Sequence, residues 1–298
     1  MYHNPVLLNK SVEGLNIRED GVYVDATFGG GGHARAILKQ LGNEGCLVAF
    51  DQDIDAEANQ PDDDRLIFVN QNFRYLKNFL RLYNKVPVDG ILADLGVSSH
   101  QFDEADRGFS IRMDGPLDMR MSRSQGLSAA VVVNTYSEDE LNTVLRLYGE
   151  IKNSRCMARL IVEKRKELAF STTFQLVQAV EKCIPPTRMN KMLAMLFQAI
   201  RIEVNQELDA LKMFLEQCAE LLKPGGRMVV ISYHSLEDRL VKNFIKTGNF
   251  EGKLQKDFFG NKLVDFKGVV NKAIVPDEKE IEQNSRARSA KLRIAEKI

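Results

Sequence analysis

The chain has 298 residues, 44% of them hydrophobic and 28% charged, and its 41 basic and 41 acidic residues give a net charge of zero. These values are ordinary for a globular protein with a sizeable core. They exclude a protein that coats nucleic acid with a uniformly basic surface, but they allow a local basic patch. There is no secretory cleavage pattern, no apolar run of about 18 residues to cross a membrane, and no C-x-x-C pair among the four cysteines. We therefore expect a cytoplasmic protein with free thiols.

The first hundred residues alternate between expected strands and expected helices. Short apolar runs predict strands over 22–28, 46–51, 65–73 and 88–99, and apolar residues at helical spacing predict helices over 33–42 and 78–83. The strands are near-continuous apolar runs, as in a sheet that is covered on both faces. Alternation of this kind implies right-handed crossovers and a parallel sheet.

The pattern then becomes irregular over residues 102–125 and helical after that. Helices are predicted over 137–149, where Ser137 and Glu140 have capping-box spacing, and over 153–167, 171–184 and 189–222, the last with a joint near Asn205. A buried strand over 227–235, a helix over 236–245 and two candidate strands, 268–276 and 289–298, complete the chain. The fold class is therefore α/β, with a Rossmann-like, doubly wound sheet and a mostly helical insertion after its fourth strand.

This order divides the chain into two expected domains. Residues 1–101 and 201–298 form a discontinuous sheet domain, and residues 102–200 form the helical insertion.

The segment "DATFGGGGHA", residues 25–34, contains the strongest local signal. A glycine-rich turn between a strand and a helix presents free backbone N–H groups, and ligands of open parallel sheets lie at the carboxyl ends of the strands. Asp51, Phe73 and Asp94 lie at the ends of the next three strands. Each of them alone is more often a turn, cap or core residue, but together they favour a cofactor that contains a nucleoside.

Two cofactors fit this pattern of glycines. The spacing of residues 29–34 does not exclude a nicotinamide dinucleotide, so a nicotinamide-dependent oxidoreductase remains an alternative. Asp25, however, would repel a pyrophosphate, whereas it suits a cofactor with an ammonium and a sulfonium group. The sequence therefore favours S-adenosylmethionine, because an acidic residue before a glycine loop is typical of methyltransferases on this fold.

Longer segments resemble a known family. These segments are "HNPVLLNKSVEGL", "DATFGGGGHA", "DLGVSSHQFDEADRGFS", "GPLDMRM", "YGEIKNSRCMARLIVEKR", "FQAIRIEVNQEL", "PGGRMVVISYHSLEDRLVKNF" and "NSRARSAKLRIAEKI". In this order they resemble the bacterial small-subunit ribosomal RNA cytosine-N4 methyltransferases, the RsmH/MraW family, from His3 to the C-terminus. Ser122, Ala26, Ala34 and the stretch "TRMNKMLAML" depart from the family pattern.

The resemblance implies a reaction and a set of cofactor-binding residues. The reaction is methyl transfer from S-adenosylmethionine to the exocyclic N4 of one cytidine in the decoding centre of 16S ribosomal RNA, within the small ribosomal subunit. The residues implied to bind the cofactor are Gly31, Gly32 and His33 at its methionine end, Asp51 at the ribose, Phe73 at the adenine, and Asp94 and Gln101, which complete the pocket.

Two residues are candidates for the chemistry. A cytosine amino group is a poor nucleophile, so the enzyme must orient it and accept hydrogen bonds from its N–H groups. Asp94 is the first candidate acceptor, although it could serve the cofactor instead. His234 is the second, although a structural role at a strand end is equally compatible with the sequence. No cluster has metal-ligand spacing, and methyl transfer needs no metal.

RNA binding requires basic side chains near the reactive site. We expect RNA contacts from Arg107, Arg112 and Arg120 in the irregular segment and from Arg286 and Arg288 near the C-terminus. A non-catalytic RNA-binding assembly factor, or a methyltransferase that acts on DNA or protein, remains an alternative from the residues alone. A homodimer is compatible with the sequence.

Overall fold

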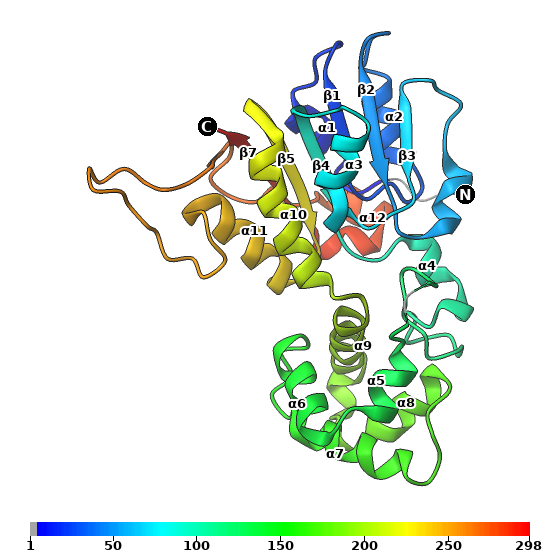
Figure 1. Ribbon diagram of the computed structural model, residues 1–298. Helices are drawn as coiled ribbons and strands as arrows, with labels where there is room; N and C mark the ends of the chain where they lie inside the picture. The colour runs from blue at the N-terminus through cyan, green and yellow to red at the C-terminus, as the bar shows by residue number, and fades with distance from the viewer. Residues whose placement is uncertain (1–4, 125) are drawn as a thin grey trace. The chain divides into compact units, whose positions relative to one another are not determined.

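The computed structural model describes residues 5–124 and 126–298. Two compact units make up the chain: the sheet unit, residues up to 96 together with 208–298, and the helical unit, residues 97–207 (Figure 1). His3, Asn4 and Gln125, which belong to segments discussed for the sequence, lie outside the described residues. In the described ranges, no helix combines the length and the apolar character needed to cross a membrane.

The sheet unit contains seven strands in the order β3-β2-β1-β4-β5-β7-β6 (Figure 1). The strands are β1 (Val22–Asp25), β2 (Cys46–Phe50), β3 (Leu66–Val69), β4 (Val88–Asp94), β5 (Leu222–Ser232), β6 (Phe266–Gly268) and β7 (Lys291–Lys297). The first five run parallel, and β7 is antiparallel to both β5 and β6. The expected α/β, Rossmann-like class is thus confirmed, with a reversed strand at one edge of the sheet.

Helices cover both faces of this sheet. One face packs Val24, Val48 and Ile91 against α3 (Leu76–Leu82), α10 (Glu207–Leu221) and α11 (Ser235–Thr247). The other face packs Leu47 and Leu92 against α1 (Leu8–Leu15) and α2 (Gly32–Leu38). Successive strand residues point to opposite faces, so near-continuous apolar runs are needed to fill both cores. The order of the strands reverses around β1 and β4, and their carboxyl ends therefore border the crevice in which such sheets bind ligands.

Several elements differ from the sequence expectations. The third strand ends at Val69 because the Asn72 side chain accepts a hydrogen bond from the Arg74 N–H and begins a short 3-10 helix. The expected strand 268–276 is reduced to β6 and an isolated bridge between Ile274 and Leu292. Helices α1 and α12 (Glu278–Gln283) were not expected. α1 begins without a side-chain cap, and α12 is only six residues long, although Asp277 caps its start.

The helical unit has its own apolar core. It contains α4 (Ser99–Asp103), α5 (Ala129–Thr135), α6 (Glu138–Leu147), α7 (Ser154–Arg165), α8 (Thr173–Val180) and α9 (Met189–Asn205). The capping box of Ser137 and Glu140 is confirmed at the start of α6. The joint expected near Asn205 is confirmed as well, because Gln206 takes a left-handed φ of 50° between α9 and α10.

Asn205 is buried and holds the irregular segment against α9. Its Oδ1 accepts a hydrogen bond from the Met121 N–H at 2.7 Å, and its Nδ2 donates to the carbonyls of Met119 at 2.8 Å and Arg201 at 2.9 Å. Met119 itself has a left-handed φ of 59°. One side chain thus satisfies backbone groups in a loop that lacks regular secondary structure, which is where such groups most need partners.

Replacement of Asn205 should therefore destabilise the helical unit. We expect Asn205→Ala to lower the free energy of unfolding by about 2 kcal/mol or more, because buried backbone groups lose their partners. Thermal denaturation should show a fall of at least several degrees in Tm, and limited proteolysis should show faster cleavage near residue 120. Asn190→Ala, at an exposed position of the same helix, is the control. Equal melting of the two variants would contradict this role for Asn205.

Candidate functional site

The glycine loop joins β1 to α2 and brings bare backbone to the carboxyl edge of the sheet. Gly29 and Gly31 have left-handed φ values of 51° and 72°. A Cβ on Gly31 would lie 2.9 Å from the Phe28 ring, and one on Gly32 would lie 2.1 Å from Pro5. The loop therefore requires glycine both for its conformation and for its packing.

Asp25 ends β1 directly before this loop and is fully buried. Its Oδ1 accepts a hydrogen bond from the Thr27 N–H at 3.1 Å, whereas its Oδ2 is buried without a partner among the described residues. Burial raises the pKa of Asp25 to about 7, and the charge of Asp51 raises it further, against the lowering effect of the Thr27 N–H. An unpartnered buried carboxylate oxygen is costly unless a ligand supplies a donor or a positive charge.

Asp94 ends β4 and lies in contact with side chains from two other elements. The hydroxyl of Tyr233, which follows β5, donates a hydrogen bond to Asp94 Oδ1 at 2.8 Å. Nδ1 of His33 lies 3.9 Å from Asp94 Oδ2, and the Asp94 N–H donates to the Thr27 hydroxyl at 2.6 Å. The side chain of Asp94 is 21% exposed, so it is enclosed but still accessible.

Burial shifts three ionisable groups of this site, Asp94, His33 and Tyr233, toward their neutral forms. Burial raises the pKa of Asp94 to about 7, and the hydrogen bond from Tyr233 opposes this rise. Burial lowers the pKa of His33 to about 4, so the imidazole is neutral at pH 7 and its contact with Asp94 is not an ion pair. Burial also raises the pKa of Tyr233 well above its usual range, so this phenol remains a donor. Such perturbed groups at a strand edge are typical of functional sites.

Asp51 ends β2 with its carboxylate directed at backbone N–H groups. Oδ2 accepts a hydrogen bond from Gly29 at 2.7 Å, and Oδ1 accepts one from Asp53 at 2.8 Å. Both oxygens of this carboxylate therefore accept hydrogen bonds from the backbone. The same residue thus fixes the glycine loop, a role that the sequence alone did not indicate.

Phe73 follows β3 and is partly buried. Its ring packs edge-to-face against Phe214 of α10, with the centroids 5.3 Å apart. The adjacent Asn72 donates from Nδ2 to Gln52 Oε1 at 2.7 Å. The structure therefore gives Phe73 a core contact on one side, and a contact with an adenine remains a prediction.

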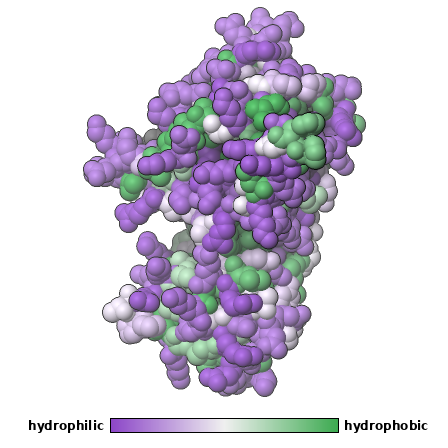
Figure 2. All heavy atoms as spheres, turned by 90° about the vertical axis from the view of Figure 1, so that its left-hand side faces the viewer, coloured by the Kyte–Doolittle hydropathy of each residue, from purple (hydrophilic) through white to green (hydrophobic). Residues whose placement is uncertain are grey.

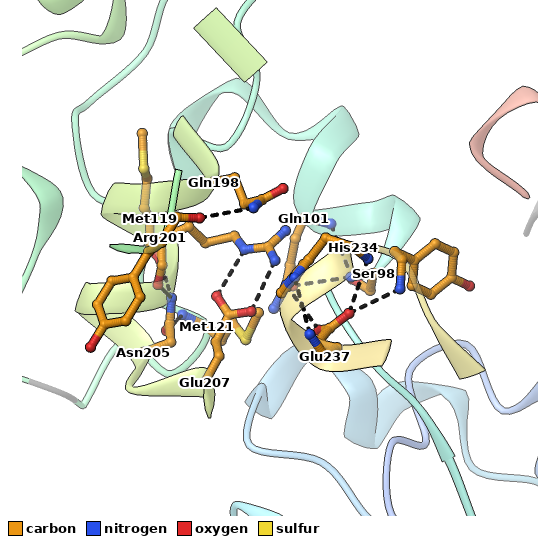
Figure 3. Close-up of polar contacts among 12 residues, drawn as sticks. Ser98, Gln101, Met119, Met121, Gln198, Arg201, Asn205, Glu207, His234 and Glu237 are labelled. Carbon is orange, nitrogen blue, oxygen red and sulfur yellow. Dashed lines mark hydrogen bonds and ion pairs between the residues drawn. The ribbon is translucent and has the colours of Figure 1, made fainter. Parts of the chain in front are cut away.

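His234 occupies the N-cap of α11 and has a local structural partner. Its Nδ1 accepts a hydrogen bond from the Glu237 N–H at 3.4 Å, and Glu237 Oε2 accepts from the backbone N–H of Tyr233 at 2.9 Å (Figure 3). This capping box gives Nδ1 a structural role. Nε2 lies 3.3 Å from Glu237 Oε1, and a part for the imidazole in the chemistry stays a prediction. The capping box also orients Tyr233, whose hydroxyl holds Asp94.

The remaining predicted residues lie in the helical unit or near the C-terminus. Gln101 closes the capping box of α4 with Ser98 (Figure 3). Arg107 is buried, and its guanidinium donates to the carbonyls of Arg120 and Met121. These contacts hold the irregular segment together and make Arg107 the least suited of the five arginines for RNA contact.

The other four arginines differ in how far they are committed to protein partners. Arg120 forms a two-pronged ion pair with Asp118, with N–O distances of 2.8 and 2.7 Å. Arg112 and Arg288 are exposed, and Arg286 is partly buried. Exposed guanidinium groups are the ones that can bind phosphate without first breaking an interaction within the protein.

Comparisons with known proteins agree over the full length of the chain. The model of the MraW methylase family matches residues 1–298. Ribosomal RNA small subunit methyltransferase H from Flavobacterium johnsoniae is 59% identical over 297 residues, which cover 100% of this chain and 98% of that protein. The protein of the same name from Bacteroides thetaiotaomicron is 58% identical over 296 residues, covering 99% and 97% of the two chains.

The chain is also similar to solved structures. The crystal structure of an rRNA methylase from Streptococcus thermophilus aligns with a TM-score of 0.43 at 12% identity and covers 97% of this chain and 93% of that chain.

The raised pKa of Asp25 predicts how stability depends on pH. Between about pH 4 and pH 7 the folded protein keeps a proton that the unfolded chain has lost, so the free energy of unfolding falls as pH rises through this window. Asp25→Asn is neutral at every pH and should weaken this fall. We expect Tm to decline less steeply from pH 4 to pH 7 in the variant than in the parent.

The control for this prediction is Asp62→Asn, which removes an exposed carboxylate. Its Tm should follow the parent across the same pH range. Parallel curves for Asp25→Asn and the parent would show that the Asp25 carboxyl titrates normally in the folded protein.

Proposed function

The chain belongs to the MraW methylase family, whose methyl donor is S-adenosylmethionine, and from this premise we propose that it methylates the exocyclic N4 of a cytidine in the decoding centre of 16S ribosomal RNA. The observation that carries the proposal is the enclosed Asp94 carboxylate, held by Tyr233 beside the glycine loop. The names of the curated relatives support the small-subunit RNA as substrate. The family match leaves no support for a nicotinamide-dependent oxidoreductase.

The residues present fit S-adenosylmethionine. The buried Oδ2 of Asp25 lacks a partner among the described residues and suits the ammonium of the methionine portion. In the glycine loop, a Cβ on Gly29 would meet nothing within 4 Å, so the backbone there is open to a ligand, whereas Gly31 and Gly32 face Phe28 and Pro5. Asp51 lies at the end of β2 against the glycine loop, where a carboxylate can accept hydrogen bonds from the ribose hydroxyls. When bound, S-adenosylmethionine supplies an electrophilic methyl group on a positively charged sulfur.

Asp94 is proposed to act on the amino group of the cytosine. Its ionised carboxylate accepts a hydrogen bond from the N4 amino group, which frees the nitrogen lone pair from the ring and aims it at the methyl group. After the methyl transfer the N4 nitrogen is positively charged, and the Asp94 carboxylate can accept the proton that this nitrogen must lose. A pKa of about 7 lets Asp94 be ionised before this step and protonated after it.

Tyr233 acts as a positioning residue. Its hydroxyl occupies Oδ1 of Asp94 and leaves Oδ2 for the substrate. The backbone N–H of Tyr233 is held by the buried carboxylate of Glu237, so the phenol is fixed at the start of α11. Hydrogen bonds that fix a reactive group in advance reduce the cost of reaching the transition state.

RNA recognition is proposed for exposed basic side chains in both units. Arg112 in the helical unit, and Arg286 and Arg288 in the sheet unit, are the candidates that remain accessible or partly accessible. The target base must be unpaired or extruded before its amino group can be reached. We place this activity in the cytoplasm, where the small ribosomal subunit is available.

Nucleoside mass spectrometry tests the reaction, the cofactor and the substrate together. The protein is incubated with methyl-deuterated S-adenosylmethionine and small ribosomal subunits that lack the modification. We expect labelled N4-methylcytidine at one site of 16S RNA. Cofactor binding without a labelled nucleoside would favour a non-catalytic assembly factor, and label only in DNA or protein acceptors would replace the RNA assignment.

Tyr233→Phe tests the positioning role through the pH profile. Loss of the hydroxyl removes an interaction that lowers the pKa of Asp94, so this pKa should rise further. The acidic limb of kcat/KM should then move to higher pH, and activity at pH 7 should fall by roughly tenfold for a loss of about 1.4 kcal/mol. Tyr83→Phe, at an exposed position, is the control and should keep the parent profile. Coincident profiles for Tyr233→Phe and the parent would remove Tyr233 from the mechanism.

A further inference from the structure

A hairpin formed by residues 251–265 extends from the sheet unit between α11 and β6 (Figure 1). Its base is anchored to the end of α11. The ring of Phe250 stacks on Phe244 with the centroids 5.3 Å apart and the planes at 16°. The Asn249 side chain accepts hydrogen bonds from the N–H groups of Gly252 and Lys253 and donates to the Lys253 carbonyl at 2.6 Å. The hairpin therefore leaves the helix in a fixed direction.

The tip of the hairpin, residues 257–261, is a tightly bonded turn. Oδ1 of Asp257 accepts hydrogen bonds from the N–H groups of Phe259 at 2.9 Å and Asn261 at 2.8 Å, and Oδ2 accepts from Nδ2 of Asn261 at 2.9 Å. Gly260 takes the left-handed φ of 85° that the turn requires. Below the tip, Lys256 and Lys262 form an antiparallel bridge. These contacts fix the conformation of the hairpin tip.

This turn presents two aromatic rings to solvent. Phe258 is 98% exposed and Phe259 is 84% exposed, and the rings meet edge-to-face with their centroids 5.6 Å apart. Figure 2 looks at the side from which the hairpin extends and shows apolar side chains, in green, among hydrophilic ones, in purple. Phenylalanine buries about 150–250 Å² when it is covered, so two uncovered rings on a fixed turn indicate a binding surface.

Three lysines flank these rings on the two strands of the hairpin. Lys253, Lys256 and Lys262 are exposed, and among residues 5–124 and 126–298 none of their ammonium groups has an ion-pair partner. Residues 251–265 also contain three acids: Glu251 is exposed, Asp257 accepts hydrogen bonds within the turn, and Asp265 pairs with Lys297 at 2.6 Å. A group of such lysines around exposed aromatics matches a phosphate backbone with accessible bases. Protein–protein interfaces, by contrast, are depleted in lysine.

We propose that the hairpin tip binds an unpaired segment of the RNA substrate, with nucleobases stacked on Phe258 and Phe259 and phosphates bound by the neighbouring lysines. The proposal rests on the proposed function, because it takes the substrate to be RNA. Asp94 and Tyr233 lie before the first residue of α11, and the hairpin follows its last residue. A helix of 13 residues spans about 20 Å, so this contact is remote from the target base and anchors the RNA.

Fluorescence provides a direct test, because the chain contains no tryptophan. Phe259→Trp places a single reporter at the tip of the full-length protein, and stacking of a base on the indole should quench its emission. We expect quenching when deproteinised 16S RNA is added, as well as with small ribosomal subunits. Leu82→Trp, at a site that is 68% exposed at the end of α3, is the matched control and should not be quenched.

Kinetics provide a second readout. Stacking is worth about 1–3 kcal/mol per base, so we expect Phe258→Ala/Phe259→Ala to raise KM for small subunits at least about tenfold, with kcat and the affinity for S-adenosylmethionine little changed. Phe258→Tyr/Phe259→Tyr keeps both aromatic faces and should restore the parent KM. Lys256→Glu/Lys262→Glu should reduce the slope of log affinity against log salt by about 1.4, because each phosphate neutralised on a single strand contributes about 0.7 to that slope.

Three outcomes would overturn the proposal. Quenching by intact subunits but not by deproteinised RNA would assign the tip to a protein of the subunit. A concentration-dependent change of emission in the protein alone, matched by a dimer in sedimentation, would assign it to self-association. Unchanged emission with an unchanged KM would leave the tip without a ligand. Failure of the parent protein to methylate RNA would reject the proposed function separately, because quenching does not depend on methylation.

Discussion

The burial of two carboxylates at the ends of neighbouring parallel strands is the constraint on which this site depends. Asp25 ends β1 and Asp94 ends β4, and these strands lie side by side where the strand order reverses. Burial raises the pKa of both to about 7, and the charge of Asp25 further raises the pKa of Asp94. Protonation reduces the cost of burying two such groups, and a positively charged ligand would stabilise their ionised forms.

The surrounding structure fixes these carboxylates through backbone groups and uncharged donors. Thr27 donates its N–H to Asp25 and accepts from the Asp94 N–H, so the glycine loop and the end of β4 are joined through one residue. Tyr233 donates to Asp94 from the other side, and His33 is neutral. None of these partners carries a positive charge, which suits a cofactor with ammonium and sulfonium groups.

The two ends of α11 have different roles in the function that we propose. Its N-terminal capping box orients Tyr233 toward Asp94, and its C-terminal end anchors the hairpin that carries Phe258 and Phe259. Positioning of the reacting groups needs enclosure and directed hydrogen bonds, whereas capture of a large RNA needs exposed aromatic and basic groups. One helix can serve both because its ends lie about 20 Å apart.

The sequence by itself determined the parallel sheet and the residues at the carboxyl ends of its strands. The spacing of the apolar residues and the positions of the glycines predicted β1 to β5 and the joint near Asn205. They also placed acidic residues at the strand ends, because each of these features depends on local sequence. Only the tertiary structure decided how the side chains are used: Asp51 holds the glycine loop, Arg107 is buried on backbone carbonyls, and His234 caps a helix. The tertiary structure also showed that the rings of Phe258 and Phe259 are exposed to solvent. Partners and burial depend on residues that are distant in the chain, and no local pattern encodes them.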